Sequence, residues 1–432
     1  MNENFKWGCI QPLTGGMYLG AERAIGKPAN WIISYPGLTD LVVDNKTGEI
    51  VDAANEYNLV EYLTKHNRMP DYFIMNRTMT QNDEVIAPKY TLNGEDATPD
   101  LTNMDLVVAV PVCAGLTMGS NPVTRATRKE ENNCQMVWMT KYVLKGIKPK
   151  VYLFENAPTL MSDRGDNVRD QLETIAFESG YSVVYYKTDT KYHNNCQKRP
   201  RTFIYFFKNR NGEKFIPELG YEHIIPKSVE EFFNNMGELR ENDPMNVELN
   251  NDVWVKVPLG YVNHKFGPNW REFVNGDIFN FVARTPEERE PFMEFVKANY
   301  CEKWVKTYTR YLNHIDEKLA DKCGWWATTA KSFDNCIPAC MYKNMPIVVH
   351  HKEDRLYTMR EWLWAMGHPT DFDMTGTPWN YFRKIGQNVP ANTARWVASE
   401  AMRIIANWDN EPSVDNGQNV AFFDNTKQKR VW

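Results

Sequence analysis

Six short apolar runs, alternating with helical patterns and turn residues, are the feature that most limits the folds open to this chain. They lie at residues 7–10, 31–35, 106–110, 151–154, 182–186 and 202–207. Their enrichment in valine, isoleucine, tyrosine and phenylalanine favours strands over buried helices. Strands that alternate with helices predict an α/β fold built on a mostly parallel, doubly wound sheet. Ligands of such sheets bind at the carboxyl ends of the strands.

Two helices are indicated by apolar stripes with helical spacing. One of them ends before Gly180, where a C-terminal glycine is expected. The other lies near the end of the chain. Their stripes consist of Val168, Leu172, Ile175 and Ala176, and of Ala394, Val397, Ala398, Ala401, Met402 and Ile405. The regular pattern breaks down between about residues 209 and 350, which predicts a second, less regular domain.

The composition is that of an ordinary folded protein, with 42% hydrophobic and 24% charged residues among 432. A net charge of -5 argues against a protein that coats nucleic acid by bulk electrostatics, but a local basic cleft is compatible with it. Eight cysteines without regular short spacing indicate free thiols in a reducing compartment. We see no signal peptide and no long apolar segment, so we expect a cytoplasmic monomer without membrane contact.

Reactive side chains stand at the ends or edges of three predicted strands. Cys113 follows the third run, Glu155 follows the fourth, and Arg199 and Arg201 precede the sixth. A thiolate can attack a flat, electron-poor heterocycle, and a carboxyl group can protonate its ring nitrogen. A guanidinium can bind a carbonyl oxygen of the same ring. These groups together predict covalent addition to a heterocyclic base.

A series of motifs extends in a fixed order along nearly the whole chain. They are Gly15-Gly16-Met-Tyr-Leu19-Gly20-Ala-Glu22, Gly94-Glu-Asp96, Val110-Pro-Val-Cys113, Phe154-Glu155-Asn156-Ala, Gln197-x-Arg199-x-Arg201, Arg355-Leu-Tyr-Thr358-Met-Arg360-Glu361 and Ile385-Gly386-Gln-Asn-Val389-Pro390. In this order they resemble the cytosine-5 DNA methyltransferase family. The resemblance implies a Rossmann-like methyltransferase sheet. It also implies methyl transfer from S-adenosylmethionine to a cytosine flipped out of double-stranded DNA.

The resemblance assigns a role to each reactive residue. Cys113 is the expected nucleophile at ring carbon 6, and Glu155 is expected to contact N3 and the exocyclic amine. Arg201 is expected to hold the ring oxygen, with Arg199 supporting it. The cofactor is expected to contact the glycine-rich loop and residues of the later motifs, namely Thr14, Gly15, Gly16, Asp96, Pro111, Asn388 and Val389.

The chain departs from the family pattern mainly around the cofactor. The segment Cys9-Ile-Gln11-Pro-Leu13 replaces the usual Asp-Leu-Phe-x-Gly, and Ser34 stands where an acidic residue usually follows the second strand. Gln387 replaces an asparagine of the last motif, and Ala114 replaces the glutamine after the nucleophile. Three interpretations stay open: substituted contacts to S-adenosylmethionine, a pocket reshaped for a modified donor, and a catalytically silent homologue that binds nucleic acid.

We predict a catalytic domain at residues 1–208, completed by residues 351–432, and a target-recognition domain at residues 209–350. Because a related branch of the family modifies transfer RNA, an RNA cytosine-5 methyltransferase is the alternative among enzymes. We predict no metal site. The only suggestive group, Cys336 and Cys340 with His350 and His351, has no common zinc-binding spacing.

Overall fold

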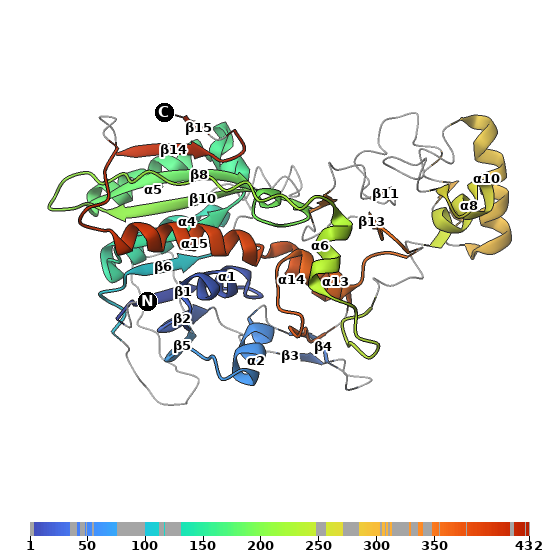
Figure 1. Cartoon of the computed structure of the whole chain (residues 1–432), viewed down its shortest axis with the longest axis horizontal. Helices are drawn as coiled ribbons and strands as arrows, with labels where there is room; N and C mark the ends of the chain where they lie inside the picture. Colours follow the sequence, from blue (N-terminus) through green and yellow to red (C-terminus); the bar gives the residue numbers. More distant parts are fainter. Residues whose placement is uncertain are drawn as a thin grey trace.

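The computed structural model contains one nine-stranded sheet among the residues that it describes (Figure 1). The strand order is β15-β14-β8-β10-β7-β6-β1-β2-β5. The strands are β1 (Trp7–Ile10), β2 (Trp31–Ser34), β5 (Tyr72–Met75), β6 (Leu106–Ala109), β7 (Val151–Asn156), β8 (Tyr181–Asp189), β10 (Pro200–Lys208), β14 (Val420–Asp424) and β15 (Lys429–Val431). Pairing is parallel from β5 through β2, β1 and β6 to β7, and antiparallel on both sides of β10.

The structure describes residues 4–34, 41–43, 48, 50–53, 56–75, 100–111, 116, 131–247, 256–270, 285–302, 305–306, 308–309, 312, 328–329, 336–339, 348–353, 355–376, 378–414, 419–427 and 429–431. Its main helices are α1 (Gly16–Ile25), α2 (Tyr57–Lys65), α4 (Glu131–Tyr142), α5 (Asp166–Glu178), α6 (Val229–Met236), α8 (Lys256–Phe266), α10 (Pro286–Asn299), α13 (Met359–Ala365), α14 (Pro378–Gln387) and α15 (Ala391–Ala406). No helix of these segments has the length and apolarity needed to cross a bilayer.

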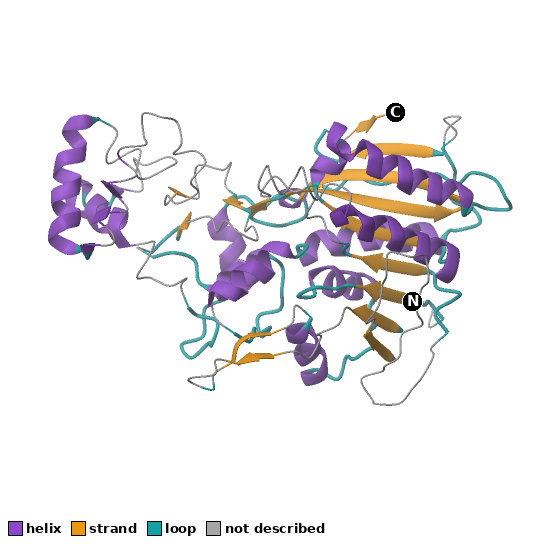
Figure 2. Cartoon of the chain, turned by 180° about the vertical axis from the view of Figure 1, so that it is seen from behind, coloured by secondary structure: helices purple, strands orange, loops and turns teal. Residues whose placement is uncertain are grey.

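Helices cover both faces of the sheet (Figures 1 and 2). One core lies between the sheet and the pair α1 and α15, and the other lies between the sheet and the pair α4 and α5. The alternation of side chains along each strand divides them between the two cores. In β6, for example, Leu106 and Val108 belong to the first core, whereas Val107 and Ala109 belong to the second. The sheet is therefore doubly wound.

The predicted fold class is confirmed. All six predicted strands are present in this sheet, although β8 and β10 extend beyond the predicted runs at both ends. The two predicted helices correspond to α5 and α15. Gly180, directly after the end of α5, has a left-handed φ of 76°. The order β5-β2-β1-β6-β7 is Rossmann-like. The chain first adds β2 and β5 on one side of β1 and then returns to add β6 and β7 on the other side.

The described residues of the segment at 209–350 contribute no strand to the large sheet. Figure 1 shows α8 and α10 at the end of the molecule farthest from the sheet. Tyr261 of α8 packs edge-on against Phe292 of α10, with ring centroids 5.1 Å apart. A short parallel pair, β9 (Gln197–Lys198) with β12 (Ile337–Pro338), connects this segment to the chain that leads into β10.

Candidate active site

Four parallel strands and one antiparallel strand place their polar residues at the same edge of the sheet. The carboxyl ends of β1, β2, β6 and β7 meet there because these strands are parallel. The beginning of β10 reaches the same edge because β10 runs antiparallel to β7, with Thr202 opposite Asn156. Residues that are far apart in sequence, such as Glu155 and Arg201, are thereby brought together.

Glu155 and Arg201 form an ion pair at this edge. Arg201 Nε lies 2.5 Å from Glu155 Oε1, and the Glu155 side chain is only 7% exposed. Burial raises the pKa of Glu155, while the charges of Arg201 and Arg199 act in the opposite direction. Because burial and the arginine charges oppose each other, the protonation of Glu155 can change when a heterocyclic base binds beside it. This property suits a general acid.

The neighbouring Asn156 shapes the chain after β7. Its Oδ1 accepts a hydrogen bond of 2.9 Å from the backbone N–H of Ala157. A short 3-10 helix (Pro158–Met161) begins there, and Thr159 Oγ1 donates to the carbonyl of Leu116. Leu116 and Pro111, both buried, are the described residues nearest to Cys113 in the sequence. Cys113 and Asp96, predicted nucleophile and predicted cofactor contact, lie outside the described residues.

Arg199 and Arg201 differ in surroundings, although only one residue separates them in the sequence. Arg199 lies in the break between β9 and β10 and is fully buried. Its Nη2 donates to the carbonyls of Gly386 and Asn388, at 2.7 and 2.9 Å. Arg201 instead contacts Glu155. The strand is interrupted because the N–H of Arg199 donates to Asp189 Oδ1 rather than to a partner strand.

The glycine-rich loop connects β1 to α1 and packs against the turn before α15. Gly15 has a φ of 97°, a conformation that side chains rarely adopt. A Cβ atom on Gly16 would lie 1.8 Å from the carbonyl oxygen of Val389, so only glycine fits there. The N–H of Gly16 donates to Asn388 Oδ1 at 3.0 Å. Gly15, Gly16, Asn388 and Val389, four predicted cofactor residues, are thus close together.

A buried histidine completes this arrangement. His368 Nε2 lies 3.1 Å from the carbonyl oxygen of Thr14 and 3.1 Å from Asn388 Nδ2. Burial lowers the pKa of His368 to about 4, so the imidazole is neutral at pH 7. The Thr14 hydroxyl donates to the carbonyl of Lys384, at 3.4 Å. The amide of Asn388 is therefore used within the protein, where it connects the two loops.

A buried carboxyl group, that of Glu56, lies beside the end of β2. Glu56 directly precedes α2, and its carboxyl group interacts with the hydroxyl of Ser34. Burial raises the pKa of Glu56 to about 7, although its own backbone N–H, Ser34 and the charge of Lys384 lower it. No carboxylate directly follows β2 in the sequence, but the fold brings that of Glu56 to the end of this strand.

The hairpin formed by β3 (Leu41–Val43) and β4 (Ile50–Ala53) explains why Glu56 was missed. It separates Glu56 from the end of β2 along the chain, so that Glu56 does not directly follow the strand in the sequence. The signal that identifies such a residue is an acidic side chain at the start of the next helical pattern, here residues 57–65.

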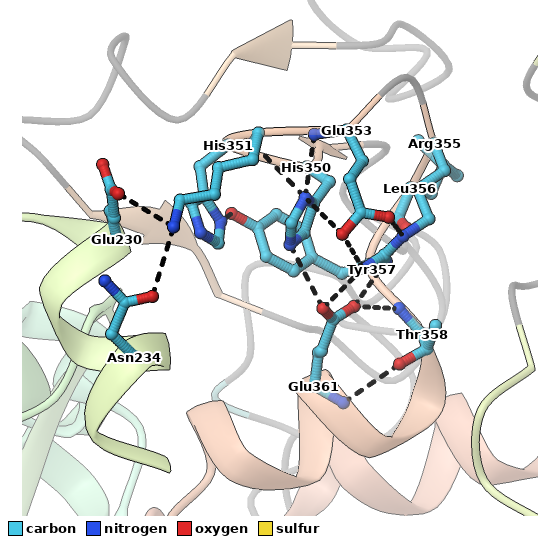
Figure 3. A network of polar contacts seen from close by, with 11 residues as sticks. Glu230, Asn234, His350, His351, Glu353, Arg355, Leu356, Tyr357, Thr358 and Glu361 are labelled. Carbon is cyan, nitrogen blue, oxygen red and sulfur yellow. Dashed lines mark hydrogen bonds and ion pairs between the residues drawn. The ribbon is translucent and has the colours of Figure 1, made fainter. Parts of the chain in front are cut away.

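A polar network around Glu361 fixes the start of α13 (Figure 3). Arg355 donates to both carboxylate oxygens of Glu361, at 2.7 and 2.9 Å. His350 Nε2 lies 3.2 Å from the same carboxylate, while His350 Nδ1 accepts from the backbone N–H of Glu353 at 3.1 Å. The N–H of Thr358 donates to Glu361 as half of a capping box. With both ring nitrogens of His350 engaged, this network is structural.

Ion pairs extend from this network into the segment at residues 209–350. Lys352 pairs with Glu230 of α6 at 2.9 Å. Arg360, which is buried, pairs with Asp243 at 2.7 Å and with Asp373 at 2.6 Å. The motif that begins at Arg355 therefore connects the inserted segment to the helices that pack near the glycine-rich loop.

Comparisons with known proteins provide a family and a fold. The family described as C-5 cytosine-specific DNA methylase matches residues 71–403. A putative DNA modification methyltransferase encoded within an E. coli prophage has a similar structure, with a TM-score of 0.50 and 15% identity over 94% of this chain and 100% of that chain. The methyltransferase EhMeth of Entamoeba histolytica has a TM-score of 0.50 and 10% identity, over 93% of this chain and 99% of that chain. No curated protein sequence matches this chain.

Proposed function

The chain belongs to the C-5 cytosine-specific DNA methylase family, and from this premise we propose that it methylates carbon 5 of cytosine in double-stranded DNA. The observation that carries the proposal is the ion pair between Glu155 and Arg201 at the carboxyl edge of the sheet. A carboxyl group and a guanidinium side by side match the N3 and O2 edge of a cytosine ring.

In the proposed reaction, the thiolate of Cys113 adds to ring carbon 6. Glu155 donates a proton to N3, which accepts the electron pair displaced by the attack. Arg201 holds the O2 oxygen, where negative charge also develops. Carbon 5 would then take the methyl group as the sulfur–methyl bond of the donor breaks, leaving S-adenosylhomocysteine. Loss of the carbon 5 proton to a base, departure of the Cys113 sulfur and return of the N3 proton to Glu155 then restore the aromatic ring. A flipped base is required because the stacked duplex hides the ring face that the sulfur attacks.

The residues around the glycine-rich loop fit S-adenosylmethionine, which supplies the methyl group from its sulfonium centre. Gly15 and Gly16 allow the tight turn between β1 and α1 and its packing against Leu59 and Val389, and Thr14 lies beside them. Glu56 stands near the end of β2, where Rossmann-like proteins use a carboxylate to bind ribose hydroxyls. We include Glu56 with the predicted cofactor residues Asp96, Pro111, Asn388 and Val389.

We propose that residues 209–350 form the target-recognition domain, with the catalytic domain formed by residues 1–208 and 351–432. The large sheet supports this division, since its described strands come only from these two flanking parts. The position of α8 and α10 away from the sheet also supports it (Figure 1).

The proposal is tested by incubating the protein with methyl-labelled S-adenosylmethionine and either duplex DNA or transfer RNA. Digestion to nucleosides then shows where the label lies. The expected product is 5-methylcytosine in DNA only. Label in RNA alone would overturn the DNA assignment, and label in neither, with tight S-adenosylmethionine binding absent, would favour a silent nucleic-acid-binding homologue.

A further inference from the structure

Arg199 donates hydrogen bonds from both its main chain and its side chain. Its N–H donates to Asp189 Oδ1 at 3.0 Å, at the end of β8. Its Nη2 donates to the carbonyls of Gly386 and Asn388. A guanidinium Nη atom carries two hydrogens, so both donors of this atom are engaged by the turn before α15. The side chain thus connects β8 to that turn.

Asn388 passes this connection on to the glycine-rich loop. Its carbonyl accepts from Arg199, and its Oδ1 accepts from the N–H of Gly16 at 3.0 Å. Its Nδ2 lies 3.1 Å from His368 Nε2, which in turn lies 3.1 Å from the carbonyl oxygen of Thr14. A buried path of hydrogen bonds therefore leads from Arg199 through Asn388 to Gly16 of the glycine-rich loop.

We propose that Arg199 is a positioning residue for the methyl donor: it fixes the Gly386–Asn388 turn, and Asn388 then keeps the glycine-rich loop in its binding conformation. The inference rests on the proposed function, and it replaces the expectation that Arg199 acts only by supporting Arg201. Hydrogen bonds from a charged donor are stronger than neutral ones. Without them, two buried carbonyls lose their partner and the turn can shift.

A measurement of methyl transfer alone does not distinguish the positioning role of Arg199 from its effect on Glu155. The charge of Arg199 also lowers the pKa of Glu155, so its loss would affect the general acid as well. Binding of S-adenosylhomocysteine, the demethylated product of the donor, involves no proton transfer to a base. The affinity for this product therefore reports on the loop and not on Glu155.

The test is calorimetric titration of S-adenosylhomocysteine into four folded proteins: the wild type, Arg199→Met, Arg199→Lys and Arg201→Met. We expect Arg199→Met to bind about ten- to a hundred-fold more weakly, because the lost hydrogen bonds come from a charged group. We expect Arg199→Lys to recover part of the affinity. Arg201→Met, the matched control two residues away, should bind within about twofold of the wild type while its methyl transfer is lost.

Wild-type affinity in a folded Arg199→Met protein would overturn the inference and leave the proposed function intact. A wild type that binds no S-adenosylhomocysteine would overturn the donor assignment, and this inference with it. If Arg199→Met does not fold, Arg199→Lys is combined with Asn388→Ala, which removes the acceptor of the Gly16 N–H and so breaks the same path farther along. For each variant, the fold loss of affinity for S-adenosylhomocysteine is measured. A loss in the double variant that is smaller than the product of the two single losses supports the inference, and a loss equal to that product contradicts it.

Discussion

Arg201 Nε lies 2.5 Å from Glu155 Oε1, across the antiparallel pair of β10 and β7. The contact exists because β10 runs antiparallel to β7 and begins where β7 ends. The contact places a positive charge beside the Glu155 carboxyl group, which is almost fully buried, and so affects its protonation. Burial favours its protonated form and the arginine charge favours its ionised form.

Glu155→Gln is expected to lower the rate of methyl transfer about a hundred- to ten-thousand-fold, since an amide cannot donate the proton of a carboxyl group. Affinity for S-adenosylhomocysteine should stay within about twofold of the wild type. Single-turnover kinetics with labelled donor measures the first and calorimetry the second. The control is Glu173→Gln on α5, whose carboxylate bonds Tyr185 away from this edge. Equal rates in the two variants would show that Glu155 is not the acid.

Donor affinity is expected to depend on the ionisation of Glu56. With a pKa raised to about 7, this group is mostly protonated at pH 6 and mostly ionised at pH 8. A carboxylate accepts hydrogen bonds from ribose hydroxyls better than a neutral acid does. Affinity for S-adenosylhomocysteine should therefore rise from pH 6 to pH 8 in the wild type.

Two variants test the role of Glu56: Glu56→Gln directly before α2, and Glu61→Gln within α2 as its control. Glu56→Gln should bind more weakly at pH 8 and with no pH dependence, whereas Glu61→Gln, on the exposed side of α2, should behave as the wild type. A pH profile that persists in Glu56→Gln would assign the titration to another group and remove Glu56 from the donor site.

Gly16→Ala is expected to destroy donor binding by steric conflict. Its Cβ would lie 1.8 Å from the main-chain oxygen of Val389, a contact that no side-chain rotation can relieve. The matched control is Gly146→Ala, whose Cβ would lie 3.5 Å from the Tyr142 ring, an ordinary contact. Thermal melting with and without S-adenosylhomocysteine compares the two. An equal ligand-induced increase in Tm for both variants would contradict the packing of these loops.

Glu361→Gln is expected to lower the free energy of unfolding by about 3 kcal/mol at pH 7, because it removes the buried carboxylate that pairs with the partly buried Arg355. Glu353→Gln, which removes the exposed partner of the same arginine, should cost less than about 1 kcal/mol. Urea unfolding measures both. Similar losses in the two variants would indicate that the network of Figure 3 carries little stability.

The effect of Glu361 also has a defined pH dependence. Burial raises its pKa, but hydrogen bonds from Arg355 and His350 and the charge of Arg355 outweigh this and bring it to about 2. A carboxyl group with a lowered pKa stabilises the folded state above its unfolded pKa of about 4.3. The difference between the wild type and Glu361→Gln should therefore be constant from pH 6 to 8 and shrink as the pH falls from about 4 towards 2.

The sequence was sufficient for the parts of the fold that local pattern determines. The buried strands β1, β2, β6, β7, β8 and β10 have runs of β-branched and aromatic residues, and α5 and α15 have clear apolar stripes. Strand β14 was not predicted because its place is set by a long-range parallel pairing with β8. Strand β5 is likewise defined by its pairing with β2.

The order of the motifs was enough to predict that Glu155 and Arg201 share one site and that Gly16 and Asn388 share another. It was not enough for Glu56, since an inserted hairpin separates this residue from the strand end that it approaches. Motif order also does not show that Arg199 and Arg201 have different surroundings, because the Asp189 side chain accepts from the backbone N–H of Arg199 and interrupts the strand there. Both failures come from tertiary contacts that no local pattern contains.

The most direct test of the central claim is covalent capture of Cys113. Long duplex DNA in which 5-fluorocytosine replaces cytosine contains every target site, and fluorine at carbon 5 prevents the proton loss that releases the enzyme. With S-adenosylmethionine present, the wild type should form a DNA adduct that survives denaturing electrophoresis, and Cys113→Ala should form none. An adduct of equal yield with Cys113→Ala, or no adduct with a wild type that binds the donor, would contradict the account.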